Sequence, residues 1–153
     1  MSTTLIKNAR IITPTGISPG SVLVSGGKIR SVWFGEAPDA GADRIIDAGN
    51  RYLSPGFIDI HTHGAGGADF MDGSLDAVYT ACRAHMEHGT TSIVPTTITS
   101  TSESLLSFVE LFNRVELQRA DMPNILGLHL EGPYFAYEQR GAQDPKYLRA
   151  PDP

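Results

Sequence analysis

Hydrophobic and polar positions divide the chain into two parts with different periodicities. Residues 5–52 contain short apolar segments separated by turn residues, a pattern typical of β-strands. Two of these segments, 21–24 and 28–34, flank Ser25-Gly26-Gly27, and glycine adopts the positive φ of a hairpin turn at little cost. We therefore expect residues 1–54 to form a small β domain. A sheet this small is marginal alone, so other strands or a neighbouring domain would have to cover it.

From residue 55 onward, strand and helix patterns alternate. Alternation of this kind predicts parallel strands joined by right-handed crossovers. The first turn after a strand lacks the Gly-x-Gly-x-x-Gly of a dinucleotide-binding sheet, which favours a closed barrel. Because a complete (β/α)8 barrel needs ~250 residues and eight strands, we expect residues 55–153 to be the first three βα units of an incomplete barrel. The predicted strands are buried segments at 55–64, 90–96 and 124–131, and the predicted helices have apolar residues at three-to-four spacing over 75–86 and 105–115.

Composition excludes several classes of protein. The 153 residues carry a net charge of −5 and include no basic stretch interleaved with aromatics, which argues against a nucleic-acid surface. No run approaches the ~20 apolar residues of a membrane helix, and the first residues do not resemble a signal peptide. A single cysteine, Cys82, fits a reducing compartment. We expect a cytoplasmic protein with neither a nucleic-acid nor a membrane partner.

Imidazole and carboxylate side chains fall at the ends of two predicted strands. His61 and His63 are two residues apart and share one face, and two imidazoles at a strand's carboxyl end are half of a metal site. His-x-His alone is weak evidence, but His129 and Glu131 share a face of the third predicted strand. A carboxylate buried there is costly unless it is paired or binds a cation. The residues leave two interpretations open, a metal site or an ion pair between Glu131 and an arginine such as Arg140.

Other polar residues have structural interpretations. His85 and His88 fall in the last turn of the first predicted helix, where cations are favoured. Asp69 and Asp72 are candidates to cap the start of that helix. Residues 96–100 are interpreted as a polar strand exit that caps the second helix.

Three stretches resemble a known family. The segment PGFIDIHTHG at 55–64 resembles the first-strand signature of the amidohydrolase superfamily, and GLHLEGPY at 127–134 with RGAQDP at 140–145 resembles N-acetylglucosamine-6-phosphate deacetylases within it. The resemblance implies a metal-dependent (β/α)8 TIM barrel beside a small β-sandwich built from both chain ends, of which residues 1–54 would be the amino-terminal half. It also implies removal of the acetyl group from N-acetylglucosamine 6-phosphate, giving glucosamine 6-phosphate and acetate.

The resemblance assigns roles to individual residues. It implies that Glu131 is a metal ligand and that His61 and His63 hold a second metal. The implied cofactor is one or two divalent ions (zinc, iron, cobalt or manganese) per complete subunit, in a homodimer. The family's acid/base aspartate would lie beyond Pro153, so we expect no catalytic residue here and a truncated chain that is inactive alone. The implied sugar contacts are Ala142 and Gln143.

Two other functions stay open. A different amidohydrolase, related to dihydroorotases or hydantoinases, would typically supply a carboxylated lysine near the middle of the barrel, whereas Lys146 lies in a predicted loop. A non-catalytic split-barrel module would need a partner chain to cover its three exposed strands.

Overall fold

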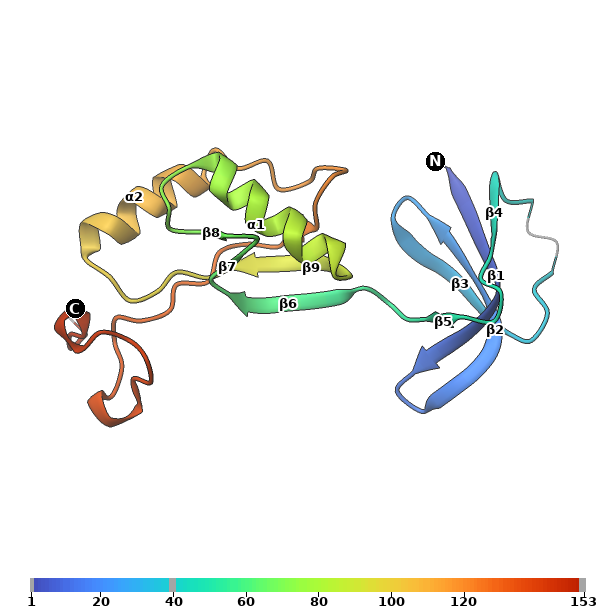
Figure 1. Cartoon of the computed structure of the whole chain (residues 1–153), viewed down its shortest axis with the longest axis horizontal. Helices are drawn as coiled ribbons and strands as arrows, with labels where there is room; N and C mark the ends of the chain where they lie inside the picture. Colours follow the sequence, from blue (N-terminus) through green and yellow to red (C-terminus); the bar gives the residue numbers. More distant parts are fainter. Residues whose placement is uncertain (1, 39–40, 152–153) are drawn as a thin grey trace. The chain divides into compact units, whose positions relative to one another are not determined.

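The computed structural model describes residues 2–38 and 41–151. Its backbone contacts group the chain into two compact units, Met1–Pro55 and Gly56–Pro153, which we call the amino-terminal and carboxyl-terminal units. The described part of the first contains strands, and the second combines strands with helices (Figure 1). The chain is therefore a mixed α/β protein.

The amino-terminal unit is a five-stranded sheet built around its longest strand, β1. The sheet order is β3-β2-β1-β4, and β5 also pairs with β1. The predicted hairpin joins β2 to β3, with Gly26 and Gly27 at φ 56° and 73°. β2 runs antiparallel to β1 and β3, while β4 and β5 run parallel to β1. The strands are β1 (Thr3–Thr13), β2 (Gly16–Ser25), β3 (Lys28–Phe34), β4 (Arg44–Asp47) and β5 (Tyr52–Leu53).

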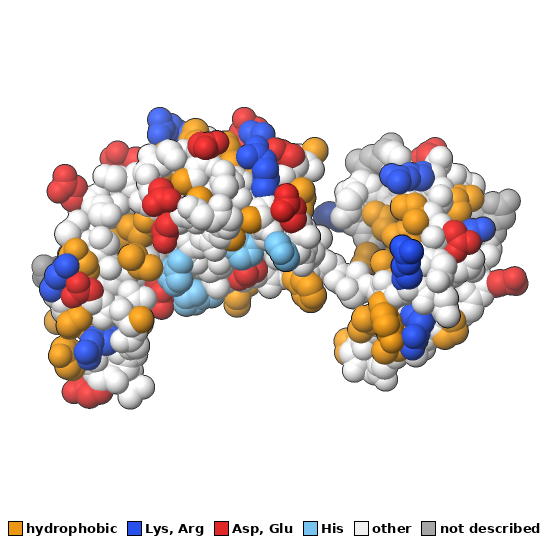
Figure 2. Space-filling model, viewed as in Figure 1, with side chains coloured by type: hydrophobic (Ala, Val, Ile, Leu, Met, Phe, Trp, Pro, Cys, Tyr) orange, Lys and Arg blue, Asp and Glu red, His pale blue; other side chains and the backbone are white. Residues whose placement is uncertain are grey.

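The core of this sheet is small. Its buried hydrophobic cluster consists of Ala9, Ile11 and Val22. Larger apolar side chains stay exposed, including Phe34 at 64% and Ile45 at 59% of their surface, and Figure 2 shows hydrophobic side chains on the surface of this unit. The described sheet thus buries little apolar surface by itself.

The carboxyl-terminal unit contains a three-stranded parallel sheet in the order β10-β9-β6, which confirms the predicted parallel arrangement. A short antiparallel pair, β7 and β8, follows β6 in the segment that was interpreted as the first turn after a strand. The sheet strands are β6 (Phe57–Thr62), β9 (Thr90–Pro95) and β10 (Asn124–Ile125); the pair is β7 (Gly64–Ala65) and β8 (Ala68–Asp69). The helices are α1 (Leu75–Glu87), α2 (Ser102–Phe112) and the 3-10 turns η1 (Tyr137–Gln139) and η2 (Pro145–Tyr147).

One hydrophobic core joins both helices to the sheet. Val78 and Cys82 of α1, Ile93 of β9 and Phe108 of α2 belong to a single buried cluster with Phe70. Cys82 is fully buried. Among the described residues, no helix is long and apolar enough to cross a membrane.

The first predicted strand is correct in position but wrong in burial. Ile58 and Ile60 of β6 are 65% and 67% exposed, although an apolar run was interpreted as a buried strand. β6 is an edge strand that pairs only with β9 among the described strands, and it contributes no residue to the buried cluster. The apolar face of β6 therefore has no cover in the described structure.

The third predicted strand is much shorter than expected. Regular pairing ends at Ile125, and a single parallel bridge then joins Thr96 to His129. Leu126 and Leu130 are 59% and 50% exposed, which differs from the expected buried strand. Backbone hydrogen bonds still hold this segment beside β9: the His129 N–H donates to Pro95 at 2.9 Å, and the Thr97 N–H donates to His129 at 3.0 Å.

The helix caps differ from those predicted. Ser74 caps α1 and Thr101 caps α2, each by a side-chain oxygen that accepts a backbone N–H of the first turn. Asp69 and Asp72 do not cap α1. Their carboxylates accept the N–H groups of Met71 and Asp69 in the preceding loop.

Candidate metal centre

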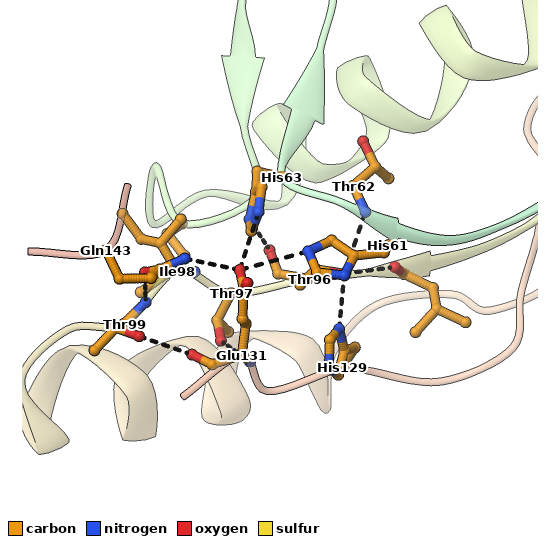
Figure 3. Close-up of polar contacts among 12 residues, drawn as sticks. His61, Thr62, His63, Thr96, Thr97, Ile98, Thr99, His129, Glu131 and Gln143 are labelled. Atoms are coloured by element: carbon orange, nitrogen blue, oxygen red, sulfur yellow. Dashed lines mark hydrogen bonds and ion pairs between the residues drawn. The ribbon is translucent and has the colours of Figure 1, made fainter. Parts of the chain in front are cut away.

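Three residues from two separate segments meet at the end of the parallel sheet. His61 belongs to β6, His63 follows it, and Glu131 lies just past the bridge at His129. Oε2 of Glu131 is 3.5 Å from Nε2 of His61 and 3.2 Å from Nε2 of His63. Figure 3 shows these side chains pointing toward one another, and Figure 2 shows histidines gathered on this surface. The structure thus brings together the residues that the sequence proposed as metal ligands.

The donor set suits a divalent cation. Nδ1 of His63 lies 3.3 Å from the carbonyl oxygen of Thr96, which can only accept, so Nδ1 carries the proton of this hydrogen bond. In the neutral ring, Nε2 then presents a lone pair toward Oε2 of Glu131, another acceptor. Two acceptors at 3.2 Å need a cation or a proton between them. Nitrogen and carboxylate oxygen are ordinary ligands of zinc and related ions, and the three ligand atoms lie within 4.8 Å of one another.

The ion pair between Glu131 and Arg140 is not formed. Arg140 donates to the carbonyl oxygen of Tyr137 at 2.7 Å, and its guanidinium carbon lies 4.0 Å from the centroid of the Tyr137 ring. Besides the two histidines, the carboxylate of Glu131 contacts Gln143, whose Nε2 donates to Oε2 at 2.9 Å. Gln143 also accepts the backbone N–H of Thr99 at 2.9 Å. Ala142, the other predicted sugar contact, is exposed beside Gln143.

The sequence interpretation missed the role of the threonines after β9. Thr97 Oγ1 accepts the backbone N–H of Glu131 at 3.2 Å, and Thr99 Oγ1 donates to its carbonyl oxygen at the same distance. Thr97 has no exposed surface, and 2% of Thr99 is exposed. They were assigned to a strand exit that caps α2, but Thr101 performs that function. Consecutive threonines directly after a buried strand were the available signal.

Thr96 links β6 to His129. Its hydroxyl donates to the carbonyl oxygen of Val94 and accepts the N–H of Thr62, both at 3.2 Å. Nδ1 of His129 lies 3.4 Å from the same hydroxyl, and its ring centroid is 5.0 Å from that of His61. His129 therefore lines the site beside His61.

His85 and His88 behave differently from each other. Nδ1 of His88 lies 2.8 Å from the Ala84 carbonyl oxygen at the end of α1, as expected for a helix-end residue. His85 instead reaches β6, with Nε2 3.1 Å from Thr62 Oγ1 and Nδ1 3.7 Å from a carboxylate oxygen of Asp59. The other oxygen of Asp59 accepts the N–H of His61 at 3.1 Å. His85 thus supports β6, the strand that carries His61 and ends just before His63.

Comparison with known proteins identifies many similar sequences. The chain is 34% identical to the N-acetylglucosamine-6-phosphate deacetylase of Danio rerio over 152 residues, covering 95% of this chain and 37% of that protein. It is 34% identical to the Bacillus subtilis enzyme of the same name over 154 residues, covering 97% of this chain and 38% of that protein. The chain therefore spans well under half the length of these relatives.

Solved structures give the same picture. The N-acetylglucosamine-6-phosphate deacetylase of Pasteurella multocida matches with a TM-score of 0.82 and 31% identity, covering 99% of this chain and 40% of that one. A mutant of the Mycobacterium smegmatis enzyme, solved with N-acetyl-D-glucosamine-6-phosphate, matches with a TM-score of 0.77 and 33% identity, covering 99% and 38%. A D-hydantoinase matches less closely, with a TM-score of 0.54 and 28% identity over 89% of this chain and 28% of that one.

A model of the amidohydrolase family matches residues 52–151, which include all three residues of the candidate metal centre. Members of this family generally depend on divalent metal ions, in keeping with two imidazoles and a carboxylate at the end of a parallel sheet. Because the match extends over well more than half of the 153 residues, the chain belongs to the amidohydrolase family.

Proposed function

We propose that the protein acts in the metal-dependent deacetylation of N-acetylglucosamine 6-phosphate, which yields glucosamine 6-phosphate and acetate. The observation that carries the proposal is the convergence of His61, His63 and Glu131 at one end of the parallel sheet. Relatives at 34% identity that bear the deacetylase name support the substrate. The proposal concerns an enzyme of the relatives' full length, of which this chain spans 37–38%.

The proposed architecture is a (β/α)8 barrel beside a β-sandwich. Residues 55–153 would supply the first three βα units, and residues 1–54 would supply the amino-terminal half of the sandwich. The parallel order β10-β9-β6, with helices between the strands, supports the barrel. The exposed isoleucines of β6 also support it, because further helices of a barrel would cover that face.

Glu131, His61 and His63 would hold one or two divalent ions, of zinc, iron, cobalt or manganese. When bound, such an ion would polarise the amide carbonyl and lower the pKa of a water molecule from ~15.7 towards ~7. The chain's own groups fix the ligands: Thr96 orients His63, and Thr97 and Thr99 hold the backbone of Glu131.

Substrate contacts and acid/base chemistry complete the proposal. Ala142 and Gln143 would contact the amino sugar. Among the described residues we assign none as the group that deprotonates water and protonates the leaving amine. The homodimeric state and the cytoplasmic location stay predictions.

A hydantoinase-like activity is the second candidate, because a D-hydantoinase has a related structure. Its expected lysine is not found at a strand end among the described residues of the carboxyl-terminal unit. Lys146 lies in η2 and pairs with Asp144 at 2.9 Å. The deacetylase of Pasteurella multocida matches 99% of this chain with a TM-score of 0.82, against 0.54 for the D-hydantoinase, so the deacetylase is the better supported function.

Two measurements test the deacetylase proposal. In the purified chain, Glu131→Gln should abolish binding of Co²⁺ or Zn²⁺, whereas Glu138→Gln, on an exposed glutamate of η1, should not. In a chimera, residues 56–151 replace the matching segment of the Bacillus subtilis relative, and acetate release from N-acetylglucosamine 6-phosphate is measured. A chimera that folds and binds metal but releases no acetate would contradict the proposed substrate.

A further inference from the structure

We propose that Gln143 is a positioning residue that holds the Glu131 carboxylate in place for metal binding, in addition to any contact with the sugar. This inference rests on the metal site of the proposed function. Its basis is that both ends of the Gln143 amide are engaged, one by the backbone of Thr99 and the other by the Glu131 carboxylate (Figure 3).

The orientation of the Gln143 amide follows from the chemistry of its partners. The backbone N–H of Thr99 can only donate, so the amide oxygen of Gln143 must face it, at 2.9 Å. The NH₂ group is then directed to Oε2 of Glu131, also at 2.9 Å, which as a carboxylate oxygen accepts. A reversed amide would place the NH₂ group of Gln143 against the N–H of Thr99 and its oxygen against Oε2 of Glu131.

Thr99 closes a ring of hydrogen bonds around Glu131. The backbone N–H of Thr99 donates to Gln143, and Gln143 donates to the Glu131 carboxylate. The Thr99 hydroxyl donates to the Glu131 carbonyl oxygen at 3.2 Å. Thr99 itself is buried, with 2% of its surface exposed. The carboxylate is thereby tied to a buried residue by Gln143, which lies 12 positions after Glu131 in the chain.

The hydrogen bond falls on the oxygen that faces the two imidazoles. Oε2 accepts from Gln143 and also lies 3.2 Å and 3.5 Å from Nε2 of His63 and His61. A donor on a carboxylate oxygen restricts the rotation of the carboxylate, which favours its use as a metal ligand. The second N–H of the amide is left for a sugar oxygen. Gln143 can therefore connect the metal site with the sugar site.

The test compares Gln143→Leu with Gln139→Leu, a matched change at an exposed glutamine of η1. Leucine keeps most of the side-chain volume but can neither donate nor accept. Affinity for Co²⁺ is measured in the purified protein by competition with a chelator, together with the absorption spectrum of the bound ion. Loss of such a supporting residue typically weakens metal binding roughly 10–100-fold. We expect a loss of this size for Gln143→Leu, an altered spectrum, and no change for Gln139→Leu.

A rescue variant separates positioning from a general effect on folding. Gln143→His keeps one ring nitrogen to accept from Thr99 and one to donate to Glu131, so it should restore most of the Co²⁺ affinity. If Gln143→Leu fails to fold by near-ultraviolet circular dichroism, this histidine variant still decides. Two results would overturn the inference. One is a Co²⁺ affinity of Gln143→Leu within twofold of the parent protein, and the other is a folded Gln143→His variant that binds Co²⁺ as weakly as Glu131→Gln. If Glu131→Gln itself binds Co²⁺ normally, the proposed metal site fails instead.

Discussion

Replacing Thr97 with valine would test whether the buried threonines after β9 support the candidate site. Thr97 has no exposed surface, and its hydroxyl accepts the backbone N–H of Glu131 at 3.2 Å. Valine has almost the same shape but no hydroxyl, so the N–H of Glu131 loses its partner without a cavity forming. An unpaired buried N–H costs about 1–3 kcal/mol. This hydrogen bond is only partly buried, so we expect a loss of about 1–2 kcal/mol.

The assay follows both stability and metal binding. Urea unfolding monitored by far-ultraviolet circular dichroism gives the free energy of unfolding, and chelator competition gives the Co²⁺ affinity. Thr97→Val should lower both, with a loss of affinity of roughly tenfold because the backbone of Glu131 is released. Thr97→Ser keeps the hydroxyl and should retain most of the affinity.

A matched control lies on β9, the strand that precedes Thr97. Thr91 of β9 is exposed, and its hydroxyl makes only a long 3.4 Å contact with the Phe57 carbonyl oxygen. Thr91→Val should therefore change the free energy of unfolding by no more than about 0.5 kcal/mol. If Thr97→Val and Thr91→Val have the same unfolding curve and the same Co²⁺ affinity, the supporting role of Thr97 is refuted.

Three further predictions concern other parts of the carboxyl-terminal unit. Burial raises the pKa of the Cys82 thiol to about 11, so alkylation by iodoacetamide at pH 8, followed by mass spectrometry, should be on the order of a hundredfold slower than for a free thiol; rapid labelling without denaturant would contradict this. Hydrogen bonds from Arg119 and then Arg83 hold the pKa of Asp121 well below its usual range. A depressed carboxylate pKa stabilises the fold above its ordinary value near 3.8, and this contribution is lost as pH falls further. Asp121→Asn should therefore lower the urea midpoint at pH 7, with a difference from the parent that shrinks below pH 4; equal midpoints at pH 7 would be inconsistent with that stabilisation. Gly132 has φ +80°, and an added Cβ would collide with the Thr99 hydroxyl. Gly132→Ala should therefore lower the free energy of unfolding in urea by about 1–3 kcal/mol and weaken Co²⁺ binding; an unchanged Co²⁺ affinity would contradict this.

Local periodicity accounts for what the sequence could predict. α1 and α2 follow from apolar residues at three-to-four spacing, because one face of each helix packs on the shared core. The pairing of His61 and His63 with Glu131 follows from the topology, since parallel strands carry their carboxyl ends to the same edge. Neither inference needs any knowledge of distant side chains.

Burial of β6 and the length of the third strand could not be predicted in the same way. An apolar run shows that Ile58 and Ile60 suit a buried position, but their exposure depends on which elements flank an edge strand. The pattern of 124–131 suits a strand, yet its regular pairing ends at Ile125. Single hydrogen bonds to the neighbouring strand keep that segment in place, and no periodicity encodes them.

The position of Glu131 therefore depends more on the residues after β9 than on β10, which ends at Ile125. Its backbone N–H and carbonyl oxygen bind the hydroxyls of Thr97 and Thr99, 34 and 32 positions earlier in the chain. Its carboxylate binds Gln143, which Thr99 anchors in turn. A ligand that follows an irregular segment needs such external support, because no ladder of strand hydrogen bonds sets its direction. Substitutions at Thr97, Thr99 and Gln143 should accordingly weaken metal binding more than substitutions at the exposed Leu126 and Leu130.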